Sequence, residues 1–217
     1  MSLAFFDMDG TIIGGDTNDI SFDAFLKLGI IDDTVIKKLN AYEDQFYKGE
    51  LNVDEFVQFA ASQLTRFNKD ELYKLLDEVV AKYIIPVVKP GAKRAIDFHN
   101  KRGDVVVIVT STMDYLVEHI ARQLNIKYFI ASPMEKVNGA LTGRQAGMPA
   151  YKEGKVTKIK EFIKEHNLSL EDSYGYGDTI NDLPMLMICE HKYAVDPNKK
   201  LLQDPLIKEL EIVDWTK

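Results

Sequence analysis

Residues 3–11 read LAFFDMDGT, and this stretch decides the fold. The apolar residues 3–6 are too few for a helix and are typical of a short buried strand. Gly10 then frees the backbone for a sharp turn. Asp7 and Asp9 are therefore expected at the carboxyl end of a strand, where open α/β sheets place their ligands. Carboxylates this close repel each other unless one is protonated or a cation lies between them, so the pattern indicates chemistry.

Two other interpretations fit the Asp-x-Asp-Gly pattern on its own. Asp and Gly are ordinary turn residues, so in isolation a solvated turn is the more frequent meaning. A calcium loop also begins Asp-x-Asp, but it needs a bidentate Glu at its twelfth position, where this chain has Asn18. It also needs a preceding helix, for which the residues before Asp7 leave no room. The calcium loop is excluded.

Composition narrows the class of protein. A chain of 217 residues, 46% of them hydrophobic, can bury one good core and a smaller second one. A net charge of -7 argues against a nucleic-acid surface, and no apolar run is long enough to span a membrane. The lone Cys189 and the absence of a signal-peptide pattern predict a cytoplasmic protein. The four histidines show no ligand spacing and are expected on helices, exposed or partly buried.

The chain divides by the period of its apolar residues. Residues 14–85 carry helical spacing with recurring helix-start signals and no β-rich run, which predicts a four-helix insert. Residues 1–13 and 86–217 are predicted to form the core, a doubly wound α/β domain with a mostly parallel sheet. The expected core strands are residues 105–109, 128–131, 173–176 and 193–195, with a hairpin around 137–141 and helices at 91–101, 113–124, 153–166, 183–188 and 198–210.

Further polar residues stand where this sheet would expose them. Residues 110–112 (TST) follow the second core strand, Asp178 follows a later one, and Lys155 opens the helix between them. Taken singly, each of these groups has another explanation that is at least as good. The hydroxyls and Asp178 can cap helices, and Lys155 can be a solvated lysine. Together they place hydroxyl, ammonium and carboxylate groups at one edge of the sheet. This coincidence favours a site.

At this point the chain resembles the haloacid dehalogenase-like (HAD) superfamily of phosphotransfer hydrolases. The first motif of the family is similar to residues 7–11 (DMDGT). The second motif is a strand that ends in Ser or Thr and is similar to residues 105–110. The fourth motif, Gly-Asp-x-x-x-Asp with an Asn, is similar to residues 177–182. The third motif, a Lys at a helix start, resembles Lys155, with Lys152 as the fallback. The helical insert looks like the cap of subfamily IB, which includes phosphoserine phosphatases.

The resemblance implies a phosphatase that uses Mg²⁺ and an aspartyl-phosphate intermediate. It implies Asp7 as nucleophile, Asp9 as general acid and base, and Thr110 and Lys155 as holders of the transferring oxygens. It implies Mg²⁺ ligands from Asp7, Asp178 and the backbone carbonyl of Asp9, with Asp182 orienting Lys155. The implied substrate-binding residues are Gly10, Asp16, Ser111, Thr112 and Asn181.

The chain departs from phosphoserine phosphatases where they bind their substrate. Ser111 and Thr112 stand where those enzymes have two glycines, and Asp16 stands in place of a Glu. Their cap Arg falls near Ala60, and Arg66 replaces it only if the alignment slips. An Arg–carboxylate pair is bidentate and strong, so its loss predicts poor hydrolysis of free phosphoserine.

The expected function is hydrolysis of a small phosphorylated metabolite, with no nucleic-acid or membrane partner. A phosphotransferase that moves the phosphoryl group to an alcohol stays open, as does a non-catalytic binding protein on the same fold. The cap is expected to close over the site through hinges at residues 14–15 and 86–90. The sequence does not indicate an oligomeric state.

Overall fold

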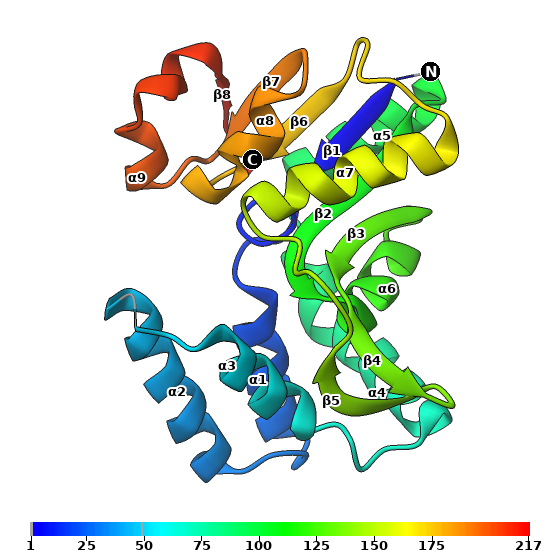
Figure 1. Ribbon diagram of the computed structural model, residues 1–217, viewed down its shortest axis with the longest axis vertical. Coiled ribbons are helices and arrows are strands. Elements are labelled where there is room, and N and C mark those ends of the chain that lie inside the picture. Colours follow the sequence, from blue (N-terminus) through cyan, green and yellow to red (C-terminus); the bar gives the residue numbers. More distant parts are fainter. Residues whose placement is uncertain (1, 49) are drawn as a thin grey trace.

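The apolar run at the N-terminus forms the central strand of a parallel sheet (Figure 1). The computed structural model describes residues 2–48 and 50–217. The strands are β1 (Leu3–Phe6), β2 (Val105–Met113), β3 (Tyr128–Ser132), β4 (Met134–Val137), β5 (Ala140–Gln145), β6 (Tyr174–Gly177), β7 (His191–Val195) and β8 (Glu211–Val213). The helices are α1 (Thr17–Lys27), α2 (Asp33–Lys48), α3 (Val53–Ser62), α4 (Lys69–Val79), α5 (Pro90–Arg102), α6 (Asp114–Gln123), α7 (Glu153–His166), α8 (Leu183–Met187) and α9 (Lys199–Leu202).

The six-stranded sheet has the order β3-β2-β1-β6-β7-β8, and all its strands are parallel. The chain builds outward from β1 on one side through β2 and β3, then returns to the other side of β1 with β6. Phe6, at the end of β1, pairs with Ile108 on one side and Tyr176 on the other. The strand order therefore reverses between β1 and β6, which is where α/β sheets place their ligands.

Helices cover both faces of the sheet, as predicted. Successive residues of a strand point to opposite faces. Leu3 and Phe5 join a core cluster with residues of α7 and α8, whereas Ala4 and Phe6 join a second cluster with residues of α5 and α6. The doubly wound, mostly parallel fold class is confirmed.

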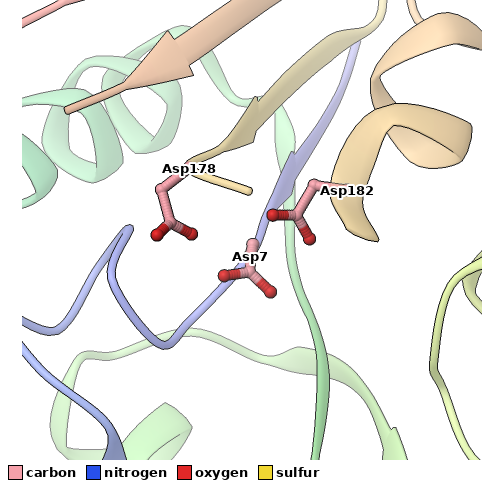
Figure 2. A group of neighbouring side chains, drawn as sticks. All are labelled: Asp7, Asp178 and Asp182. Atoms are coloured by element: carbon pink, nitrogen blue, oxygen red, sulfur yellow. The ribbon is translucent and has the colours of Figure 1, made fainter. Parts of the chain in front are cut away.

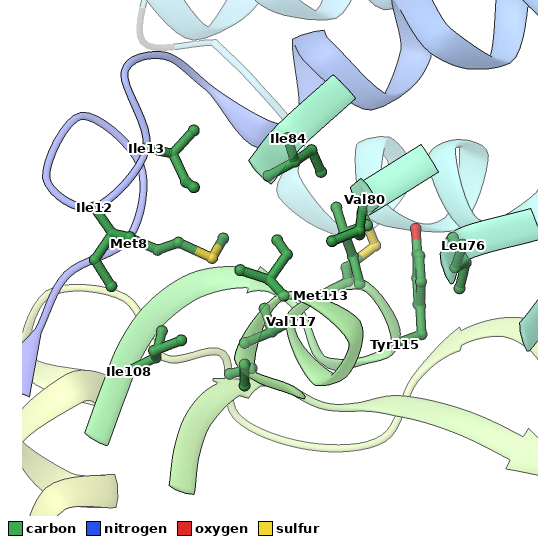
Figure 3. Packing of buried hydrophobic residues seen from close by; sticks show 14 of the residues in the cluster. Met8, Ile12, Ile13, Leu76, Val80, Ile84, Ile108, Met113, Tyr115 and Val117 are labelled. Carbon is green, nitrogen blue, oxygen red and sulfur yellow. The ribbon is translucent and has the colours of Figure 1, made fainter. Parts of the chain in front are cut away.

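The helical insert follows β1 and contains the four predicted helices, α1 to α4, continued by a π-helical turn at Val80–Ile84. Buried residues of the insert pack into the larger of the two core clusters. Leu76, Val80 and Ile84 of this segment share one buried cluster with Met113 and Val117 of the sheet side (Figure 3). The two core clusters are thus divided by the sheet and not by the insert.

The two chain segments that connect the sheet to the insert run side by side. Ile13 and Val88 form an antiparallel bridge, and the Gly14 amide donates to the Val87 carbonyl at 2.9 Å. The hinges expected here are therefore paired backbone segments. The division into a core of residues 1–13 and 86–217 and an insert of residues 14–85 stays a prediction. Residues 1 and 49 lie outside the described part of the chain.

Several elements differ from the sequence prediction. Strand β2 continues through Met113, so residues 110–112 lie within it, although its pairing with β3 is irregular between Val109 and Met113. Residues 198–210 do not form one helix, because Pro205 cannot continue the hydrogen bonding of α9 and begins a 3-10 turn, Pro205–Glu209. Strand β8 was not predicted. Among the described residues, no helix combines the length and apolar composition that crossing a membrane requires.

Candidate active site

Asp7 directly follows β1 and is held by a buried lysine. Lys155 Nζ lies 2.5 Å from Asp7 Oδ1 and 2.6 Å from Asp182 Oδ1, and the three side chains are almost fully buried. Lys155 lies in the first turn of α7, on the same helix face as the fully buried Ile159, because residues four apart stack on one side of a helix. The apolar contact of α7 with the sheet thereby aims the lysine at the end of β1.

Both carboxylate oxygens of Asp182 accept hydrogen bonds, which fix its side chain. Its Oδ1 accepts from Lys155, and its Oδ2 accepts from the Thr179 amide at 3.0 Å and the Thr179 hydroxyl at 2.9 Å. These bonds close the short turn that follows β6. The carboxylate of Asp182 therefore holds the lysine in place.

A third carboxylate completes the cluster. Asp7, Asp178 and Asp182 each offer an oxygen within 4.8 Å of the others, and Figure 2 shows the three side chains turned toward a common space. The Thr11 hydroxyl donates to Asp178 Oδ1 at 3.3 Å. The cluster thus brings together the ends of β1 and β6, at the point where the strand order reverses.

Burial and neighbouring carboxylates raise the pKa values of two of these acids, Asp7 and Asp178. Burial raises the pKa of Asp7 well above its ordinary value and the charge of Asp182 adds to this, while Lys155 opposes it. Burial, with the charge of Asp182, raises the pKa of Asp178 to about 7, and Lys89 acts in the opposite direction. Burial disfavours the charged form of Lys155, but the two carboxylates outweigh it and keep the pKa of Lys155 above its usual value.

Asp9 is held at the start of the insert. Its Oδ1 accepts from the Thr17 amide at 2.7 Å, in the first turn of α1, and its Oδ2 accepts from the Thr112 hydroxyl at 2.7 Å. Burial, assisted by the charge of Asp16, raises the pKa of Asp9 to about 6. A carboxyl group with such a pKa exchanges its proton near neutrality, as a general acid and base must.

Close backbone packing makes glycine necessary at two positions. Gly10 has a φ of +79°, and a Cβ atom there would lie 2.2 Å from Asp178 Oδ2. A Cβ atom at Gly177 would lie 2.6 Å from the Cβ of Asp182. The absence of side chains at Gly10 and Gly177 therefore lets the acids converge.

The other predicted residues lie near this cluster with different surroundings. Thr110 is buried and its hydroxyl accepts from the Thr112 amide at 3.1 Å, while Ser111 is exposed. Asp16 is exposed as the N-cap of α1. Asn181 accepts from the Tyr151 hydroxyl at 3.3 Å. None of these four has a hydrogen bond to Asp7, Asp178 or Asp182 in the described part of the chain.

The structure separates the two candidate lysines. Lys152 is exposed, with its Nζ 5.1 Å from the centre of the Tyr151 ring, whereas Lys155 is buried between two carboxylates. Lys155 is therefore the lysine that the fold brings to Asp7.

Sequence reasoning missed the roles of three residues in this region. The Thr17 amide and the Thr11 hydroxyl bond to Asp9 and Asp178. Lys89 donates from its Nζ to the Gly10 carbonyl and, at 2.8 Å, to Asp196 Oδ2. A lysine before Pro-Gly carries no signal of such a role, and a backbone amide carries none at all.

The donor set fits a magnesium ion. Mg²⁺ prefers hard oxygen ligands, and three carboxylates lie together here with one ammonium on two of them. Two negative charges are left over when all groups are ionised, which a divalent cation offsets. Because both oxygens of Asp182 are engaged by Lys155 and Thr179, Asp7 and Asp178 are the better ligands.

Known proteins are similar to this chain in sequence. A family model described as haloacid dehalogenase-like hydrolase matches residues 4–187. A histidinol-phosphatase of Neisseria meningitidis serogroup C is 30% identical over 222 residues, covering 99% of this chain and 99% of that protein. A phosphoserine phosphatase of Streptococcus thermophilus is 35% identical over 132 residues, covering 57% of this chain and 61% of that protein.

Solved structures extend the comparison to three dimensions. A Bordetella pertussis protein described as having unknown function superposes with a TM-score of 0.89 at 27% identity, covering 99% of this chain and 98% of that one. A phospho-aspartyl intermediate analogue of phosphoserine phosphatase superposes with a TM-score of 0.66 at 23% identity, covering 100% of this chain and 93% of that one. The second likeness concerns the fold alone.

Proposed function

Because the chain belongs to the haloacid dehalogenase-like hydrolase family and is a phosphatase of that family, we propose that it hydrolyses a small phosphorylated metabolite with Mg²⁺ and a covalent intermediate on Asp7. The observation that carries this proposal is the placement of Asp7 between Lys155 and the acid Asp178. A carboxylate can approach a phosphate dianion only where cations offset the charge.

In the proposed first step, a carboxylate oxygen of Asp7 attacks phosphorus. The Asp7 oxygen–phosphorus bond forms as the bond from phosphorus to the ester oxygen breaks. Asp9 gives its proton to the departing oxygen, so the alcohol leaves neutral. The pKa of Asp9, raised by burial and Asp16 to about 6, keeps part of the enzyme in the required protonated form near neutral pH.

In the proposed second step, Asp9 acts as a base. It takes a proton from water, whose oxygen attacks phosphorus, and the bond from phosphorus to Asp7 breaks to release inorganic phosphate. Thr112 and the Thr17 amide hold Asp9 in one orientation for both steps. Thr110 and Lys155 are proposed to hold the non-bridging oxygens of the transferred phosphoryl group.

The proposed metal ligands are Asp7, Asp178 and the backbone carbonyl of Asp9. When bound, Mg²⁺ supplies positive charge that screens the phosphate from the attacking carboxylate. Asp182 then serves to orient Lys155, as its bonds to Lys155 and Thr179 support.

Histidinol phosphate is the first substrate to test. The relative that matches over 99% of both chains is named for that compound's phosphatase. Histidinol phosphate carries an amine and an imidazole but no carboxylate, so it needs no arginine in the cap. Ala60, near the position of that arginine, is fully buried, and Arg66 donates to the Ile30 carbonyl. The surroundings of both residues support a substrate without a carboxylate.

A phosphate-release screen tests the proposal. Histidinol phosphate, phosphoserine and a broad panel of phosphate monoesters are supplied with Mg²⁺ or with EDTA. We expect Mg²⁺-dependent release that Asp7→Asn reduces at least about 10³-fold, because the nucleophile is lost. The exposed Asp97 on α5 provides a matched control, and Asp97→Asn should leave the rate unchanged.

Three outcomes of the screen count against parts of the proposal. An unchanged rate in Asp7→Asn removes the nucleophile assignment. Hydrolysis of phosphoserine as efficient as that by a dedicated phosphoserine phosphatase removes the argument from the missing arginine. When the screen is repeated with an added alcohol and product analysis, transfer of phosphate to the alcohol in preference to water identifies a phosphotransferase.

A further inference from the structure

Lys89 stands where the chain returns from the insert to the sheet. Its amide donates to the Ile12 carbonyl at 2.9 Å, beside the bridge between Ile13 and Val88, and it precedes the first residue of α5. The backbone of Lys89 is therefore fixed to the segment that follows the acidic loop of residues 7–11.

The side chain of Lys89 reaches from this point into that loop. Its Nζ donates to the carbonyl of Gly10 and to Asp196 Oδ2, and its side chain is only 11% exposed. Because peptide groups are planar, holding the Gly10 carbonyl fixes the whole Gly10–Thr11 peptide. Lys89 thus constrains the turn that carries Asp9 and touches Asp178.

Asp196 links this contact back to the acidic cluster. It follows β7 with a φ of +42° and accepts from the Trp215 amide at 3.1 Å. Two residues later, the Asn198 amide donates to the Asp178 carbonyl at 3.0 Å. The contacts form a ring that runs from Lys89 to Gly10, on to Asp178, through residues 196–198 and back to Lys89.

We propose that Lys89 is a positioning residue of the candidate active site, whose ammonium clamps the loop of residues 7–11 to the end of β7 and so keeps Asp9 and Asp178 at the spacing that a metal ion needs. This inference rests on the proposed function, because the spacing matters only if the acids bind Mg²⁺. No other described side chain joins Gly10 to residues 196–198, and a partner that orients metal ligands typically contributes 10–100-fold to metal affinity or activity.

Three variants separate positioning from bulk stability. Lys89→Met removes the ammonium at similar length, Lys89→Arg restores a cation, and Asp196→Asn weakens the clamp while keeping an oxygen for the Trp215 amide. Lys93→Met is the matched control, because Lys93 is an exposed lysine one turn further along α5. Hydrogen exchange of the peptide covering residues 7–15 is measured without metal, and Mg²⁺ affinity is measured by calorimetry without substrate.

The clamp predicts a specific set of results. Lys89→Met should speed exchange of residues 7–15 at least about tenfold and raise the Kd for Mg²⁺ about 10–100-fold. Lys89→Arg should recover part of both losses, and Lys93→Met should match the wild type. In turnover, kcat should fall more than KM changes, because displacement of Asp9 and Asp178 impairs the chemical step.

Unchanged exchange and unchanged Mg²⁺ affinity in Lys89→Met overturn the proposal. If Lys89→Met does not fold, Asp196→Asn decides by the same two measurements. A wild-type protein that binds no Mg²⁺ contradicts the proposed function, whereas the exchange measurement without metal still decides whether Lys89 holds the loop.

Discussion

Lys155 and Asp7 form a buried ion pair, with 2.5 Å between Nζ and Oδ1, although they come from a helix and a strand that lie far apart in sequence. The same ammonium also pairs with Asp182. The nucleophile proposed for this enzyme is therefore oriented before any substrate arrives. The arrangement makes the stability of the protein and its proposed activity depend on the same lysine.

Replacing Lys155 by Met should destabilise the protein strongly. Two buried carboxylates lose their cation, and breaking a buried ion pair costs about 3–5 kcal/mol of unfolding free energy. For a chain of this size, each kcal/mol corresponds to about 2–4 °C in Tm. The loss should grow as the pH rises, because the raised pKa of Asp7 lets this carboxylate take up a proton as the pH falls. Thermal unfolding of Lys155→Met and of the exposed-site control Lys152→Met measures this, and equal Tm values would contradict the buried pair.

Asp178→Asn should stabilise the metal-free protein at pH 8. Burial and Asp182 raise the pKa of Asp178 to about 7 from its ordinary value of 3.8, so the folded state binds more protons than the unfolded state between pH about 4 and 7. Stability therefore falls as pH rises through this window, and Asn removes that penalty. In EDTA, the variant should gain at least about 3 °C in Tm at pH 8 and little at pH 4.5.

Magnesium should reverse the order of the Tm values of the wild type and Asp178→Asn. A ligand that binds only the folded state raises its stability, so millimolar Mg²⁺ should raise the Tm of the wild type more than that of Asp178→Asn. An equal response would show that Asp178 does not bind the ion.

Asp16→Asn should shift the pH dependence of turnover. Burial and then the charge of Asp16 raise the pKa of Asp9, so removing that charge should lower it. Asp9 must be protonated to act as the acid, hence the alkaline limb of kcat/KM should move to lower pH and activity at pH 7.5 should fall several-fold. Asn caps a helix as well as Asp does, so α1 is kept. Asp23→Asn, an exposed change on the same helix, should leave the profile in place.

Gly10→Ala should disable the site by collision. A Cβ atom at Gly10 would lie 2.2 Å from Asp178 Oδ2, so Asp178 or the loop must move. We expect kcat to fall at least about 100-fold, since misplacement by about 1 Å costs that much. Gly29→Ala isolates the backbone contribution, because Gly29 also has a positive φ (+69°) but nothing within 4 Å. If both variants lose the same activity, the collision is not the cause.

Local patterns allowed much of the fold and part of the site to be predicted. The apolar run before Asp7 is too short for a helix, and the run at 105–109 is rich in β-branched residues, so both are typical of buried strands. Parallel strands bring their carboxyl ends to one edge of the sheet. That geometry made the approach of Asp7 and Asp178 predictable. The roles assigned to these acids stay predictions until they are measured.

Contacts that depend on tertiary packing were not predictable. Lys89 reaches Gly10 only because the chain segments at Ile13 and Val88 pair with each other, although the whole insert separates them in sequence. The histidine prediction was wrong for three residues, since His99 and His119 are buried and His191 lies on β7. His99 tolerates full burial because Asp104, at 2.8 Å, and Tyr176, at 3.0 Å, satisfy both ring nitrogens.

The bridge between Ile13 and Val88 has a consequence for how such enzymes diversify. It joins the two ends of the inserted segment, so another segment can replace the insert at this pair without a change in strand order. A replacement must still supply apolar cover for Met113 and Val117, which the present insert shields. Substrate range can therefore change by replacement of the insert at this pair, while the acids at the strand ends stay as they are.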